Sequence, residues 1–182
     1  MAFFDKWFGK KEEETRDSST LSVKNLKTGD FIDYFMSSWE VKNVFHYDWG
    51  NNYSSLEYQL YNGKETLFLH VNDDLELELC ITKAIAINKI NPMLRNIVID
   101  NDEPPSTLDF EGVTYIKQEE SQGHVSEESE DFEESYAFVM WDYADKDDKK
   151  VLSIVRNGEQ DIDAYVGENV DDFEFSNIIP KS

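Results

Sequence analysis

The feature that most constrains this fold is a regular alternation between tight-turn signals and short segments of period-2 hydrophobicity. It starts in residues 26–41 (LKTGDFIDYFMSSWEV), where Gly29-Asp30 marks a turn and an aromatic run of strand type follows. Turn signals then recur every 8 to 12 residues as far as Ile81, and Asn62-Gly63 is the strongest of them. This pattern predicts an antiparallel sheet, either closed into a small barrel or folded as a sandwich.

The pattern breaks after Ile81. Residues 83–89 suit a short helix or a strand equally, and Ile97-Val98-Ile99 predicts one more strand. Residues 100–106 (DNDEPPS) contain two prolines and no apolar residue, which marks a boundary between modules.

A second module follows the same plan. Phe110 and Tyr115 have the same spacing as Tyr34 and Trp39, and both pairs are offset by 76 residues (110−34 and 115−39). We therefore predict an all-β fold with a minor helix, made of two related antiparallel modules at residues 21–99 and 107–182. Chance similarity between two meanders is the competing explanation.

The motifs of the first module also resemble a known family. The run L-x-x-G-D, the alternating aromatics after it, Trp39-x-Val41, Tyr58-x-Leu60 and Leu67-x-Leu69 are similar to the bacterial "domain of unknown function 4178" family. The resemblance covers most of residues 21–81 and extends over residues 108–166. It implies a cytoplasmic, β-rich domain without an established activity, and it brings no catalytic residue with it.

The N-terminus has a different character. On a helix, the apolar side chains of residues 1–11 form one stripe beside a basic flank, and residues 12–20 are a charged linker. Such an arm suits contact with a membrane surface or a partner, although Glu12, Glu13 and Glu14 would repel anionic lipid. The alternative is that it docks on its own domain. The arm residues are Phe3, Phe4, Trp7 and Phe8 on the stripe and Lys6, Lys10 and Lys11 on the flank.

The charge limits the choice of partner. With 17 Lys and Arg against 39 Asp and Glu, the net charge is −22, which argues against nucleic-acid binding through a broad basic surface. Basic proteins, cationic ligands or divalent cations fit this charge better. Cys80 is the sole cysteine, so there is no intramolecular disulfide; we expect an inert, partly buried thiol and a cytoplasmic location, with peripheral contact at the inner membrane face as an option.

No motif predicts catalysis, a cofactor or a metal site. His46, His70 and His124 lack short ligand spacing, and there is neither a nucleophile elbow nor a Gly-rich phosphate loop. The acidic run of residues 119–134 predicts a solvated loop, and residues 142–148 predict a hairpin tip. Weak binding of divalent cations or a basic partner is the alternative for both.

The aromatic residues of the first module are the candidate binding residues: Tyr34, Trp39, Trp49 and Tyr53. Aromatic side chains beside acids suit cationic ligands, whereas packing in the core is the competing explanation. We predict a non-catalytic interaction module. One alternative is an enzyme that acts on a cationic small molecule with paired carboxylates, and another is a structural subunit that covers itself. The sequence leaves the oligomeric state open.

Overall fold

The computed structural model describes residues 21–128 and 135–181. Its elements are almost all antiparallel strands, so the prediction of an all-β fold with a minor helix is confirmed. The strands are β1 (Phe31–Tyr34), β2 (Ser37–Gly50), β3 (Tyr53–Tyr61), β4 (Thr66–Asn72), β5 (Glu78–Ile85), β6 (Thr107–Phe110), β7 (Val113–Glu127), β8 (Ser135–Ala144), β9 (Lys150–Asn157), β10 (Asp161–Val170) and β11 (Phe175–Ile179). The helical segments are α1 (Leu94–Asn101) and the 3₁₀ turns η2 (Ile87–Lys89) and η3 (Asp172–Glu174).

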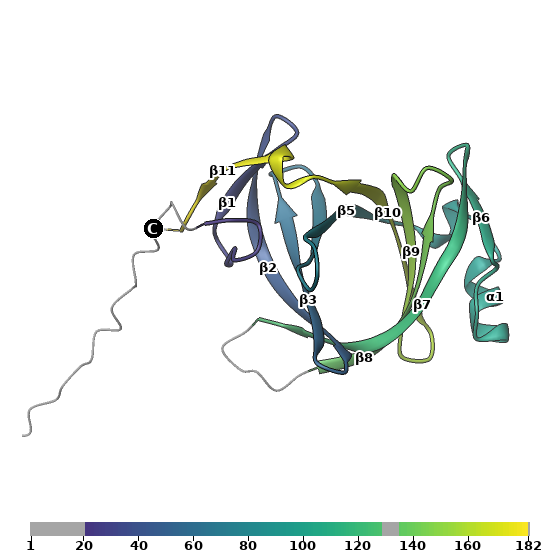
Figure 1. Cartoon of the computed structure of the whole chain (residues 1–182). Coiled ribbons are helices and arrows are strands. Elements are labelled where there is room, and N and C mark those ends of the chain that lie inside the picture. The colour runs from purple at the N-terminus through teal and green to yellow at the C-terminus, as the bar shows by residue number, and fades with distance from the viewer. Residues whose placement is uncertain (1–20, 129–134, 182) are drawn as a thin grey trace, which may run out of the picture.

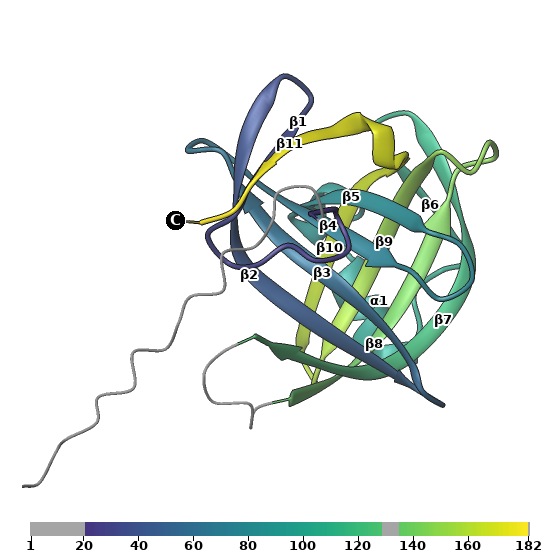
Figure 2. The ribbon, with the colours of Figure 1, turned by 60° about the vertical axis from the view of Figure 1, so that its left-hand side comes forward.

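Eight strands form a closed ring. Neighbouring strands follow the order β2-β3-β4-β5-β10-β9-β8-β7, and a further pairing between β2 and β7 closes it. Figure 1 and Figure 2 show the ring with the first half of the chain on one side and the second half on the other. The two halves therefore meet along two seams, β5–β10 and β2–β7.

The two halves repeat the same hairpin geometry. In the first, Tyr34 pairs with Ser37 across a turn, and in the second Phe110 pairs with Val113, again 76 residues later (110−34 and 113−37). Both turns have two residues at positive φ, Phe35-Met36 and Glu111-Gly112.

A β-bulge also recurs at the same offset. It lies at Lys42 between β2 and β3 and at Gln118 between β7 and β8 (118−42 = 76). A bulge adds one residue to one strand and so exchanges the faces of the residues that follow. The buried apolar side chains of β2 are therefore Trp39 and Val41 before the bulge and Val44 after it.

The first core lies on the outer face of the ring. Tyr58, Leu60, Leu69 and Ile81 point outward from β3, β4 and β5, where residues from β1, β11 and the 21–30 segment cover them. The C-terminal strand β11 thus returns to the first half, where Phe175 stacks on Tyr34 with ring centroids 4.9 Å apart. Residues 175–179, which the sequence analysis placed in the second module, complete the first core.

A buried aspartate holds this return in place. Asp30 is 1% exposed, and its carboxylate accepts hydrogen bonds from the backbone N–H groups of Lys27 (2.8 Å) and Lys181 (3.0 Å). Its own backbone carbonyl accepts from Val41 N at 2.8 Å. The Gly-Asp turn therefore joins the start of β1, the second strand and the C-terminal segment.

The second core lies on the outer face of β7–β10 and is covered by β6 and α1. The strand predicted at residues 97–99 is wrong, since these residues belong to α1. Leu94 and Val98 are four residues apart and both fully buried, so they form the inward stripe of a helix. The run of β-branched residues concealed this helical spacing.

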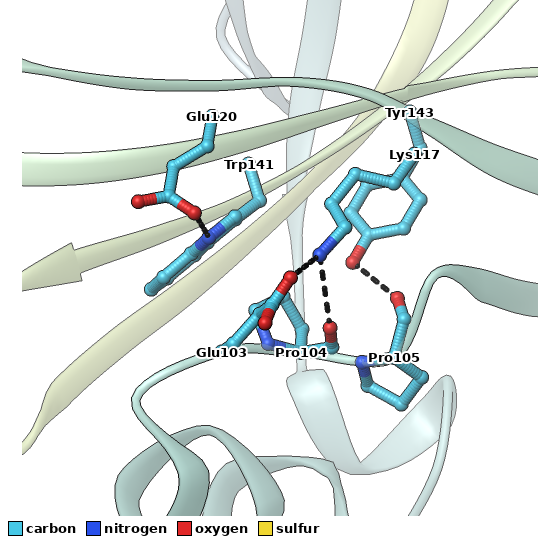
Figure 3. Close-up of polar contacts among 7 residues, drawn as sticks. All are labelled: Glu103, Pro104, Pro105, Lys117, Glu120, Trp141 and Tyr143. Carbon is cyan, nitrogen blue, oxygen red and sulfur yellow. Dashed lines mark hydrogen bonds and ion pairs between the residues drawn. The ribbon is translucent and has the colours of Figure 1, made fainter.

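Residues 103–105 of the linker are attached to the second half, as Figure 3 shows. Tyr143 Oη donates to the carbonyl of Pro105 at 2.7 Å, and Lys117 Nζ donates to the carbonyl of Pro104 at 3.3 Å and forms an ion pair with Glu103. In the same view Trp141 Nε1 donates to Glu120 at 3.0 Å. The linker therefore packs as part of this module.

The solvated loop predicted for the acidic run of residues 119–134 is also wrong in its first part. Residues 119–127 are not a loop but the end of β7, which pairs with β8 and with β2. Backbone pairing with β8 along this segment, and with β2 as well at residues 124–127, explains the strand despite the acids, because the backbone hydrogen bonds form whatever the side chains carry. Residues 129–134 of the run lie outside the described part of the chain.

Candidate ligand-binding site

A cavity of about 700 Å³ lies inside the ring and is lined by side chains from all eight ring strands. Strand alternation explains its composition: residues on β3, β4 and β5 that do not face the first core face inward instead. On β2 the bulge at Lys42 decides which residues these are. It turns Phe45, Tyr47 and Trp49 into the cavity.

One wall of the cavity is aromatic. Tyr47 stacks on Trp49 with centroids 5.5 Å apart, and Phe138 meets both rings edge-on at 5.4 and 5.2 Å. Tyr53 also stacks on Trp49, with centroids 6.3 Å apart. Trp49 Nε1 donates a 2.8 Å hydrogen bond to Ser55 Oγ on the neighbouring strand β3. The second half of the ring contributes Phe138 of β8 to this wall.

Four carboxylates also line the cavity: Glu57, Glu78, Glu119 and Asp142. Glu57 accepts a hydrogen bond from Tyr47 Oη at 3.2 Å and lies 3.8 Å from His70 Nδ1. Burial, reinforced by the charge of Glu57, raises the pKa of Tyr47 well above its usual value, so its hydroxyl remains a donor. No Lys or Arg in residues 21–128 and 135–181 lines this cavity.

Asp142 is the carboxylate on the opposite side. It accepts a short hydrogen bond of 2.5 Å from Ser153 Oγ on the neighbouring strand. Burial raises the pKa of the Asp142 carboxyl, an effect to which the charge of Glu119 adds, while Ser153 and His70 lower it. The cavity therefore holds a carboxylate whose charge burial opposes.

Cys80 faces the same space. It is partly buried, as the sequence predicted, and burial together with nearby acids raises the pKa of its thiol to about 12. The thiol is protonated at neutral pH, which makes it a poor nucleophile.

The structure separates the four aromatic residues singled out by the sequence. Trp49 and Tyr53 line the cavity. Tyr34 (7% exposed) and Trp39 (3% exposed) are packed in the first core, where Trp39 Nε1 donates to the carbonyl of Tyr34 at 3.1 Å. The arm residues Phe3, Phe4, Lys6, Trp7, Phe8, Lys10 and Lys11 lie outside the described residues.

Sequence reasoning missed the residues that complete the site. His70, which lacks ligand spacing in the sequence, lies beside Glu57 in the cavity. Asp142 was placed at a hairpin tip, which is wrong: the tip lies at residues 145–149, and Asp142 is inside β8. The signal was available, because Asp142 alternates with the buried residues Trp141 and Tyr143.

Within the described ranges, no group of three or more His, Cys, Asp or Glu side chains is placed to hold a metal ion. None of the helices described there has the length and apolar character needed to cross a membrane.

Comparison with known proteins gives two matches. The family model described as "Domain of unknown function (DUF4178)" matches residues 27–172, which include the whole ring. An "Uncharacterized protein" of Aquifex aeolicus (strain VF5) is 24% identical over 173 residues, covering 94% of this chain and 93% of that protein. No solved structure matches the chain.

Proposed function

This chain belongs to the DUF4178 family, and we propose that it is a non-catalytic binding protein that takes a cationic ligand into its ring cavity. The family resemblance stated from its motifs is confirmed. One observation carries the proposal: four carboxylates line the cavity, and no Lys or Arg of the described ranges balances them there. A low-dielectric cavity lined by one sign of charge attracts and concentrates ligands of the other sign.

The aromatic wall supports the same class of ligand. Tyr47 and Trp49 place aromatic rings beside Glu57, and a cation over the face of such a ring gains about 0.5–2 kcal/mol. The wall also offers apolar area, which a small inorganic cation would not use. The net charge of −22 would add a long-range attraction for any positively charged ligand or basic protein.

The test is a binding measurement on the full chain with a panel of organic cations, each matched to an anion and a neutral compound of similar shape. Thermal shift and isothermal titration calorimetry should show binding of cations and no response to the anions. Added salt should weaken the binding, because it screens the charges. Equal responses to cations and anions, or no response to any cation, would refute the proposal.

The enzyme alternative keeps one specific observation in its favour. Asp142 is a cavity carboxyl whose raised pKa is the property expected of a general acid or base. The two functions differ in the fate of the ligand: a binding protein releases it unchanged. Proton NMR of a bound cation, followed over hours with stoichiometric protein, would reveal any product and so favour the enzyme.

We also infer that the two halves descend from one duplicated module. The support is the shared offset of 76 residues at the hairpin turn and at the bulge, two features that sequence similarity alone left ambiguous. Contact of residues 1–11 with a membrane or partner, and a cytoplasmic location, stay predictions.

A further inference from the structure

The cavity has two unlike ends along one strand. Phe138 and Asp142 both face inward from β8, with Met140 between them. Four residues of a strand span about 13 Å, so an aromatic contact and a carboxylate are presented in line on one wall. Phe138 is packed against Tyr47 and Trp49, which makes its end of the cavity aromatic.

The two partly buried carboxylates of the cavity, Glu57 and Asp142, differ in the groups that stabilise their negative charge. Glu57 accepts a hydrogen bond from Tyr47 and faces His70, a group that becomes cationic on protonation. Asp142 accepts its hydrogen bond from a neutral donor, Ser153, and burial disfavours its charge, although His70 favours it. A cation therefore gains more binding free energy at Asp142 than at Glu57, because it neutralises a buried carboxylate whose charge the protein itself compensates poorly.

We propose that the ligand is an amphipathic organic cation, bound with its ammonium group on Asp142 and Ser153 and its apolar body against Phe138, Trp49 and Tyr47. This rests on the proposed function of the ring cavity and adds the ligand class and its orientation. A primary ammonium has three N–H donors, which suits a carboxylate and a neighbouring hydroxyl oxygen at the same time. An apolar body on the aromatic wall excludes small hydrophilic cations as tight ligands.

The experiment uses 4-phenylbutylammonium as the probe on the full chain, with butylammonium lacking the ring and 5-phenylpentanoate reversing the charge. Calorimetry should show the probe binding at least about tenfold more tightly than butylammonium, with 5-phenylpentanoate not binding. Asp142→Asn should weaken the binding of 4-phenylbutylammonium by roughly 10- to 100-fold, because a charge-assisted hydrogen bond is lost. Asp161→Asn removes an exposed carboxylate of β10 and should leave the affinity unchanged.

Two further variants test the orientation. Trp49→Leu should lower the affinity for 4-phenylbutylammonium and leave the affinity for butylammonium unchanged, because only the former reaches the aromatic wall. Ser153→Ala keeps the Asp142 carboxylate and should weaken both compounds by a similar factor. Circular dichroism and the unfolding midpoint verify that each variant is folded.

The outcomes separate this inference from the function on which it rests. If organic cations bind but Asp142→Asn binds the probe as tightly as the wild type, the orientation is wrong and the cavity function survives. If butylammonium binds as tightly as the probe, the amphipathic class is wrong. If no cation binds, the proposed function itself fails.

Discussion

At the scale of single residues, Asp30 shows how a turn motif also stabilises long-range structure. Its carboxylate accepts backbone hydrogen bonds from both ends of the described chain, at Lys27 and Lys181. Asp30→Ala should lower the free energy of unfolding by about 3 kcal/mol, because two buried donors lose a charged acceptor. Urea unfolding measures the loss, and Asp74→Ala at an exposed loop position serves as the control. Equal losses in the two variants would show that the clamp contributes nothing.

The sequence predicted the turn at Gly29-Asp30 and could not predict the clamp. A turn is encoded locally, whereas the partner at Lys181 is 151 residues away in the chain. The same reason explains the candidate site. Trp49 and Tyr53 lie in one hairpin with Glu57, and His70 pairs with Glu57 on the next strand. Phe138 and Asp142 belong to β8 and join them only when the ring closes.

At the scale of elements, the turn between β1 and β2 has two residues whose side chains disfavour the backbone conformation that they adopt. Phe35 (φ 46°) and Met36 (φ 58°) have positive φ and are 79% and 97% exposed. Such two-residue turns favour Asn-Gly, and the equivalent turn in the second half already has Gly112. Replacing Phe35-Met36 by Asn-Gly should therefore raise the free energy of unfolding by about 1 kcal/mol.

The second hairpin supplies the matched control for that change. Glu111→Asn alters one residue of a turn that already contains glycine, so its gain should be smaller, and chemical denaturation of both variants tests the order. A loss of stability on replacing Phe35-Met36 would mean that these side chains contribute to the folded state in spite of their exposure.

The seams between the halves depend on two glycines. A Cβ on Gly167 would lie 1.8 Å from the carbonyl oxygen of Ile81 at the β5–β10 seam, and one on Gly123 would lie 2.4 Å from that of Asp48 at the β2–β7 seam. Gly167→Ala should cost at least about 3 kcal/mol, since backbone and not a flexible side chain must move, and Gly123→Ala should cost less. Thermal unfolding checks both. Glu168→Ala, at the exposed neighbour of Gly167, should lie close to the wild type.

The bulges mark the limit of pattern reading at this scale. Strict alternation from Trp39 predicts that Trp39, Val41 and Asn43 share a face, but the bulge at Lys42 shifts the register, so the residues beyond it change sides. The short antiparallel strands and the turns between them were predicted from the sequence, because each is encoded locally. The ring was not visible, because its closure depends on the pairing of β2 with β7 across 76 residues or more (for example His124 with Asp48).

At the scale of the whole molecule, acids dominate the pH dependence, and 39 of them obscure the contribution of any one. A difference between two variants isolates the cavity carboxyl. Burial raises the pKa of Asp142 in the folded chain, so the folded state binds this proton more tightly than the unfolded state does. The wild type therefore loses stability as the pH rises from about 3.9, the unfolded value, through the raised folded value, and the loss is constant above it.

Asp142→Asn removes the loss of stability that comes from ionising this buried carboxyl, because the amide stays neutral at every pH and its oxygen still accepts a hydrogen bond from Ser153. The variant should be more stable than the wild type at pH 7, and the difference should shrink as the pH falls and level off below about pH 3.9. Urea unfolding at a series of pH values in constant salt measures it. The groups that face Asp142 are Glu119, His70 and Ser153. A cation bound on Asp142 should reverse the sign at pH 7, because it stabilises only the wild type. A difference that grows toward low pH would contradict both the burial of this charge and its role in binding.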